Sequence, residues 1–129
     1  NKGSEMEGLA DVMIAPEVGP EAVTGSTRMK AGTAQKMVLN MISTASMIKL
    51  GKVYTNLMVD MKPSNEKLKA RAINIVRIAT DSTEESAKTA LEESGNNVKT
   101  AILMLLKDIT KEQAGQELKK ADGFIRKAI

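Results

Sequence analysis

Residues 19–36 read GPEAVTGSTRMKAGTAQK, a loop rich in hydroxyl groups, glycine and cations that leads directly into a long apolar segment. Over residues 33–50 the apolar positions recur every three or four residues, which predicts a helix, and Gly51 follows where a left-handed C-terminal cap is favoured. Lys49 is the only charged residue between positions 37 and 50. We therefore expect most of the circumference of this helix to be buried, against a sheet or at a subunit interface.

The loop before that helix has the composition of an anion-binding site. The start of a helix leaves backbone N–H groups without intrahelical partners and carries about +0.5 of an elementary charge, which suits a phosphate or a carboxylate. Ser26 and Thr27 would add neutral donors, Arg28 a bidentate fork and Lys30 a point charge. The same residue types also precede helices simply as caps and turns, so composition alone leaves both interpretations open.

Bulk composition restricts the chemistry that the chain can carry. Its 129 residues are 42% hydrophobic, with nine Met but only one Tyr and one Phe, which predicts an aliphatic core and few aromatic surfaces for nucleic-acid binding. The cations behind the net charge of +3 are interspersed with 16 acidic residues, which also disfavours a nucleic-acid partner. Because there is no Cys and no His, thiolate nucleophiles, imidazole bases and the commonest zinc ligands are excluded.

No apolar run reaches the ~18 residues of a membrane span and no signal peptide is evident, so we expect a cytoplasmic protein without a membrane partner.

The segment before the loop predicts a strand without a sheet. Residues 9–15 form a short apolar run that ends at Pro16, as in a buried parallel strand. The only other candidate strand is 53–59, and one strand alone is not stable. The chain therefore reads as though it began in the middle of an α/β domain.

The second half predicts consecutive amphipathic helices. Three sites have the residue types and spacing of helix N-terminal caps: Ser82 with Glu85, Asn97 alone, and Thr110 with Gln113. Short loops between the helices predict a compact bundle. The apolar stripes are Leu68, Ala72, Ile75, Val76 and Ala79; Ala87, Ala90 and Leu91; Val98, Ala101, Ile102, Leu105 and Ile109; and Ala114, Leu118, Ala121, Ile125 and Ala128.

The order of residues in the loop is more specific than its composition. Residues 19–36 resemble the signature of the N-acetylmuramic acid 6-phosphate etherases and of their relatives, the glucokinase regulatory proteins. The similarity continues through Asn40, Ser43, 50–54, 56–60 and 65–68 and covers nearly the whole chain. We take the etherases as the closer relatives.

This resemblance implies a fold and a reaction. The fold is that of the sugar isomerases, a doubly wound parallel sheet that binds sugar phosphates at the carboxyl ends of its strands. The chain would then be mainly α, with 1–62 the C-terminal part of that α/β domain and 63–129 a C-terminal helical bundle. The implied reaction is cleavage of the lactyl ether of N-acetylmuramic acid 6-phosphate to N-acetylglucosamine 6-phosphate and lactate, in peptidoglycan recycling and amino sugar catabolism. It is carried out by a homodimeric carbon–oxygen lyase without metal or organic cofactor.

The resemblance also implies which residues meet the substrate. The family's two catalytic glutamates lie in an amino-terminal part that precedes the residues seen here, so we expect no catalytic residue in this chain and no activity of the chain alone. The residues implied to bind the phosphorylated amino sugar are Glu21, Thr24, Gly25, Ser26, Thr27, Arg28 and Lys30. Glu21 has an alternative role as a cap of backbone N–H groups, and Arg28 in an ion pair with Glu17 or Glu21.

Two other function classes remain open at this point. One is a non-catalytic regulator that binds sugar phosphates, like the glucokinase regulatory proteins. The other is an adaptor whose helical bundle binds a protein partner. Residues 90–105 resemble the small ubiquitin-associated domain, although Gly95-Asn96-Asn97 before an amphipathic helix is also typical of a turn with a cap.

Overall fold

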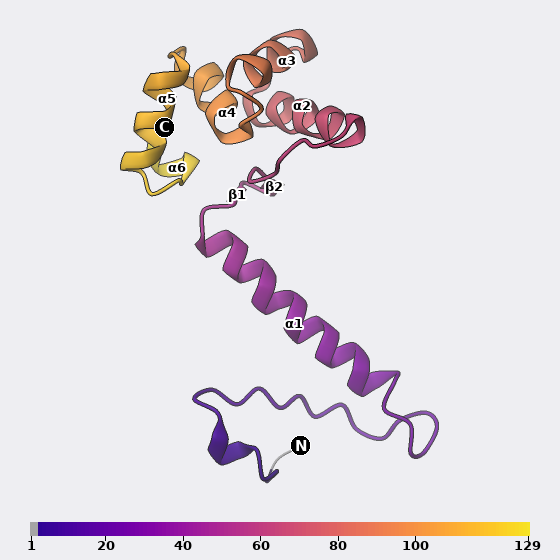
Figure 1. Ribbon diagram of the computed structural model, residues 1–129. Helices are drawn as coiled ribbons and strands as arrows, with labels where there is room; N and C mark the ends of the chain where they lie inside the picture. The colour runs from indigo at the N-terminus through magenta and orange to yellow at the C-terminus, as the bar shows by residue number, and fades with distance from the viewer. Residues whose placement is uncertain (1–2) are drawn as a thin grey trace. The chain divides into compact units, whose positions relative to one another are not determined.

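The computed structural model describes residues 3–129 and is mainly α-helical, as the sequence predicts (Figure 1). The chain divides into two compact units, the first ending at Ala45 and the second formed by Ser46–Ile129. The predicted boundary between 62 and 63 concerns the domains of the longer family members and stays a prediction. The elements are η1 (Glu7–Leu9), α1 (Lys30–Lys49), β1 (Val53–Tyr54), β2 (Leu57–Met58), α2 (Glu66–Thr80), α3 (Glu84–Glu93), α4 (Val98–Lys107), α5 (Lys111–Lys120) and α6 (Ile125–Ala128).

The strand predicted over residues 9–15 is absent. Leu9 ends the short helix η1, and residues 10–18 form neither helix nor strand. The side chains of Leu9, Val12 and Ile14 are exposed. The prediction was wrong for this structure because an extended segment becomes a strand only when a neighbouring strand pairs with its backbone. Within residues 3–129 the only sheet is the two-stranded one formed by β1 and β2.

Helix α1 begins three residues earlier and ends one residue earlier than predicted, and its cap at Gly51 is as predicted. Its C-terminus forms a Schellman motif, in which the Gly51 N–H donates to the Ile48 carbonyl (3.1 Å) and the Lys52 N–H to the Met47 carbonyl (3.0 Å). Gly51 takes the left-handed conformation there, with φ +66°. The expected burial is not found, because no residue of α1 is buried and Met41 is 59% exposed. A helix with apolar residues all round is buried only where another element covers it, and the described residues leave its surface open.

The second unit is a helical bundle with α4 at its centre (Figure 1). α4 contacts α2, α3, α5 and α6, and Ala101, Ile102 and Leu103 at its middle are fully buried. The hairpin β1–β2 pairs Val53–Tyr54 with Leu57–Met58 and leads to Val59, which is also buried. The predicted stripes, apart from Leu68, therefore form one apolar core together with residues packed against it.

Two of the predicted caps are confirmed. The Asn97 side chain accepts a hydrogen bond from the Thr100 N–H (3.0 Å) at the start of α4. Thr110 and Gln113 form a reciprocal capping box at the start of α5.

The predicted cap of α3 is displaced by one residue. Thr83, not Ser82, is the N-cap, and its hydroxyl accepts a hydrogen bond from the Ser86 N–H (3.2 Å). The Ser82 hydroxyl is instead the acceptor for the Thr80 hydroxyl (2.8 Å). Asp81, the residue that follows α2, adopts the left-handed conformation. The turn at Asp81 places the start of α3 one residue later than the sequence predicts.

The last predicted helix is two helices. α5 ends at Lys120 and α6 begins at Ile125, because Asp122 and Gly123 both adopt positive φ, +53° and +77°. Ala121, Ile125 and Ala128 are nevertheless buried as their periodicity predicts. The turn brings α6 back against α4 and α5, which a continuous helix would not do.

Candidate functional site

The loop that precedes α1 is closed by the carboxylate of Glu21. Glu21 Oε1 accepts hydrogen bonds from the backbone N–H groups of Lys30 and Ala31, both at 3.1 Å, and Oε2 accepts from Lys30 N–H at 3.1 Å. The Lys30 side chain returns to the loop and donates to the Pro20 carbonyl (2.9 Å). The N-terminus of α1, which the sequence predicts as an anion site, therefore binds a carboxylate of the same chain.

The charge state of Glu21 follows from these contacts. Hydrogen bonds from the backbone N–H groups of Lys30 and Ala31 are the largest influences and lower the pKa of the Glu21 carboxyl below its ordinary value. Burial opposes these hydrogen bonds and raises the pKa, and the charge of Lys30, the smallest of these influences, lowers it. Glu21 is consequently an anion at neutral pH, and its capping role, one of the two alternatives from the sequence, is present.

The loop between Glu21 and α1 is folded on itself. Gly25 has φ +86°, and the Ser26 N–H donates to the Val23 carbonyl (3.1 Å) across this turn. Ser26 Oγ is an acceptor for the Arg28 N–H at 3.5 Å, a long contact. The small residues of the predicted site thus shape the turn that presents Thr24 and Arg28.

Gly32 is a structural residue of this loop that the sequence reasoning did not single out. Its N–H donates to the Thr27 carbonyl (2.8 Å), and a Cβ at this position would lie 3.3 Å from the same oxygen. Gly32 lets the loop backbone approach the first turn of α1 closely.

Arg28 keeps its guanidinium available. It is exposed, none of the ion pairs described within residues 3–129 involves it, and the predicted pair with Glu21 is not formed. The Glu21 carboxylate is instead occupied by backbone N–H groups. Arg28 is therefore the cation of this loop best suited to a bidentate contact with a phosphate or carboxylate.

The first unit also contains an apolar cavity of about 550 Å³. It lies between the segment from Met13 to Val18 and α1, where Ala34 and Val38 line it. Thr27 is the one predicted binding residue in its wall. Its lining is mostly apolar, so it offers surface for packing rather than for an ion.

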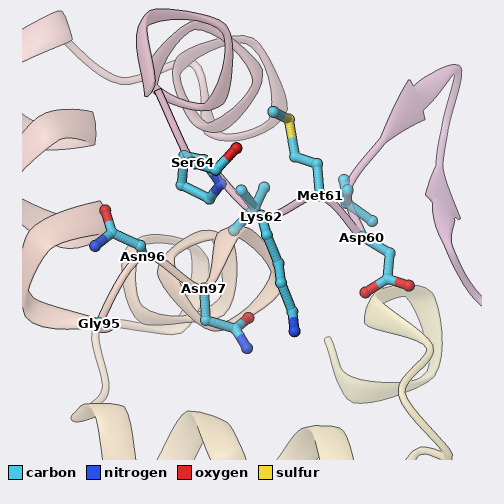
Figure 2. A pocket seen from close by; sticks show the side chains of 10 residues that line it. Asp60, Met61, Lys62, Ser64, Gly95, Asn96 and Asn97 are labelled. Carbon is cyan, nitrogen blue, oxygen red and sulfur yellow. The ribbon is translucent and has the colours of Figure 1, made fainter. Parts of the chain in front are cut away.

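A smaller polar pocket of about 360 Å³ belongs to the second unit (Figure 2). It is lined by residues 59–64, which lead into α2, and 95–98, the turn before α4. Figure 2 shows the side chains of Lys62 and Asn97 pointing in the same direction, with Asn96 turned away from them. The amide oxygen of Asn97 is already engaged as the cap of α4, and none of the predicted substrate-binding residues lines this pocket.

Asp60 at the edge of the same pocket has a partner of its own. Its carboxylate forms an ion pair with Lys52 Nζ at 2.8 Å. The hydrogen bond from Lys52 is the largest influence and lowers the pKa of Asp60. Asp60 is therefore ionised, and its ion pair joins the residue before β1 to the segment after β2, at the base of the hairpin.

The part of the chain that the structure describes holds no cluster of three or more His, Cys, Asp or Glu side chains arranged to bind a metal ion. Over the same residues, no helix combines the length and apolar character needed to cross a membrane.

No family model matches the sequence, but curated proteins align with all of it. An N-acetylmuramic acid 6-phosphate etherase of Caldanaerobacter subterraneus subsp. tengcongensis is 57% identical over 129 residues, which are the whole chain and 42% of that protein. The etherase of a Geobacillus species is also 57% identical, with 44% of its length covered, and etherase 2 of Vibrio cholerae is 56% identical, with 42% covered. The chain thus spans less than half the length of these curated relatives. Since the alignment extends over the whole chain at 56–57% identity, the resemblance is confirmed, and the chain belongs to the N-acetylmuramic acid 6-phosphate etherase family as a part of such a protein.

Proposed function

We propose that the protein containing this chain cleaves the lactyl ether of N-acetylmuramic acid 6-phosphate, giving N-acetylglucosamine 6-phosphate and lactate. The observation that carries this proposal is identity of 54–57% along the whole chain to curated proteins named for that etherase activity. The reaction is a carbon–oxygen lyase step, and the protein would act in the cytoplasm as a homodimer.

The fold of the longer protein belongs to the same proposal. Residues 1–62 would be the C-terminal part of a sugar isomerase domain, and residues 63–129 a helical bundle similar to the ubiquitin-associated domain. The exposed apolar side chains of α1 support this, because a helix apolar on all sides is ordinarily covered by a sheet or by a second subunit.

Within this function, the loop before α1 would bind the substrate through the residues from Thr24 to Lys30. The N–H groups at the start of α1 already bind Glu21, so the exposed guanidinium of Arg28 is the group that would meet the phosphate or the lactyl carboxylate. Glu21 and Lys30 would hold the loop in the shape that presents Arg28, through their contacts across the turn. The catalytic proton transfers would be supplied by residues outside this chain.

The activity is tested on the product of the complete coding region. With N-acetylmuramic acid 6-phosphate, we expect lactate and N-acetylglucosamine 6-phosphate in equal amounts, measured by an enzymatic lactate assay and by mass spectrometry. The same sugar without its phosphate is the control and should react far more slowly. Binding of the substrate without release of lactate would exclude the etherase and favour a sugar-phosphate-binding regulator.

The role of Arg28 is tested by substitution in the same full-length protein. Arg28→Ala should raise KM about 10- to 100-fold, because a charge-assisted contact contributes about 1.5–3 kcal/mol. Arg28→Lys should recover only part of the loss, since an ammonium replaces a bidentate fork. A lowered melting temperature with unchanged kinetics would make Arg28 a structural residue instead.

A further inference from the structure

We propose that the groove between α3 and α4 is a docking site for a cationic amphipathic helix of a partner protein. The groove has a volume of about 370 Å³ and lies entirely within the second unit. It contains none of the residues proposed for sugar binding, so it is independent of the etherase function.

The floor of the α3–α4 groove is apolar. Ala90 on α3 is buried, and Met104, Leu105 and Ile109 are half-buried residues that pack against the core while lining the groove. Each of these three therefore offers part of its apolar surface to a ligand. Met104 is unbranched and adapts to side chains of different shape. A helix that lays its apolar face into such a floor would bury this surface.

The rim of the groove carries carboxylates that form no ion pairs within the described residues. Glu85, Glu93 and Asp108 line it, and no ion pair among residues 3–129 includes any of the three. None of the groove-lining residues is a cation, although the chain as a whole has net charge +3. The local charge is thus opposite in sign to that of the molecule, and complementarity selects a basic partner.

The spacing of the carboxylates specifies the partner further. Glu85 and Glu93 are eight residues apart on α3, which places them about 12 Å apart along its axis. A partner helix that runs along the groove would meet both with two Lys or Arg residues eight positions apart. Apolar side chains between those cations would face Ala90 and Leu105.

The alternative occupant is a second copy of this chain. α2 carries Lys67 and Arg71 and a 52% exposed Ile78, so it is itself a cationic helix with one exposed apolar anchor. A single anchor covers less of the apolar floor than a helix with an apolar stripe. A separate partner helix therefore fits the groove better, and self-association is an outcome that the experiment distinguishes.

The probe is a synthetic amidated helical peptide with two Lys eight positions apart and Leu residues on the face between them. Its matched control has Glu in place of both Lys. The 129-residue chain should bind the Lys peptide saturably and the Glu peptide much more weakly, measured by fluorescence anisotropy and stopped flow. The association rate of the Lys peptide should fall as salt is raised.

Two double variants of α3 distinguish an effect of the groove carboxylates from a general effect of the charge on this helix. Glu85→Gln with Glu93→Gln should weaken binding of the Lys peptide about fivefold, chiefly through slower association, because exposed charge pairs each contribute modestly. Glu84→Gln with Glu92→Gln is the control, since it removes the same charge at the same spacing from α3 residues outside the groove. That control should change the affinity less than about twofold, and circular dichroism should show both variants folded.

Three results would overturn the proposal. They are equal binding of the two peptides, no saturation up to about 1 mM peptide, and equal weakening by the two double variants. Concentration-dependent self-association of the chain that is lost only in the Glu85/Glu93 variant would assign the groove to a second copy. None of these measurements uses etherase activity, so failure here leaves the proposed function untouched.

Discussion

Glu21 illustrates how much a single side chain changes the interpretation of a sequence motif. The sequence predicts an anion site at the start of the long helix, and the structure fills it with the carboxylate of Glu21 itself. The cationic groups left for an external ligand are then the side chains of the loop, above all Arg28. The N–H groups of Lys30 and Ala31 are therefore occupied by Glu21 and do not face an external anion.

The capping role of Glu21 predicts a pH dependence. Because contacts with backbone N–H groups lower its pKa in the folded loop, its stabilising effect is full above the ordinary pKa of an unfolded Glu and is lost as the pH falls through the lower, folded value. We expect the amide protons of Lys30 and Ala31 to titrate with Glu21 in an NMR pH series. In Glu21→Gln this titration should vanish and both amides should exchange faster with solvent, whereas Glu92→Gln should leave them unchanged. Amides that do not respond to pH below neutrality would contradict the cap.

Gly51 is the glycine whose replacement should be most costly. It has φ +66°, and a Cβ there would lie 3.0 Å from the Phe124 ring. Gly51→Ala should therefore lower the free energy of unfolding by about 1–3 kcal/mol, measured by urea denaturation followed by circular dichroism. Gly115→Ala is the matched control, because Gly115 lies within α5 and a Cβ there would have no other group within 4 Å, so it should stabilise by about 0.5–1 kcal/mol. Equal effects of the two substitutions would show that neither backbone conformation nor the Phe124 contact matters.

At the scale of elements, helix boundaries were predictable where the determining contacts are local. Asn97 and Thr110 bond to N–H groups three residues away, and their caps are confirmed. The start of α3 was missed by one residue, because Ser82 and Thr83 are both suitable caps and the left-handed turn at Asp81 decides between them. The break between α5 and α6 was missed because it rests on positive φ values at Asp122 and Gly123.

The displaced cap gives a direct test. Thr83→Ala should lower the free energy of unfolding by about 1 kcal/mol, since it removes the acceptor for the Ser86 N–H. Ser82→Ala should cost less, because the Ser82 hydroxyl meets only the Thr80 side chain. The measurement is urea denaturation of the two variants side by side. A larger loss of unfolding free energy for Ser82→Ala than for Thr83→Ala would support Ser82 as the cap, as the sequence predicts.

At the scale of the whole molecule, the chain has one well-packed core and one open helix. The core lies in Ser46–Ile129, whereas α1 has no buried residue and exposes apolar side chains along its length. The relatives are more than twice as long as the chain, which covers 42–44% of the three compared. The chain thus contains a folded bundle and the loop that we propose to bind substrate, and it corresponds to less than half the length of these relatives.

The isolated 129-residue chain should accordingly show no etherase activity. Elimination and hydration both require proton transfers at fixed positions, and binding groups alone supply little to the transition state. The measurement is lactate release by the purified chain beside the product of the complete coding region. Turnover within about a hundredfold of the complete protein, a difference of only ~2.7 kcal/mol in barrier, would mean that a carboxylate of this chain is catalytic.

The sequence by itself determined the family, the helical stripes of the bundle, and the caps at Gly51, Asn97 and Thr110. These features depend on contacts within a few residues or on the identity of consecutive residues, which periodicity and spacing record directly. It also named the loop residues of the candidate site, although it left the role of Glu21 open.

Only the tertiary structure decided how those pieces meet. Glu21 reaches the N–H groups of Lys30 and Ala31 across nine and ten residues, and the α3–α4 groove is formed by residues from separate helices. Residues 9–15 remain unpaired and α1 remains uncovered for the same reason. Strand pairing, burial and grooves depend on which distant segments are present to pack, and no local pattern of residues specifies that.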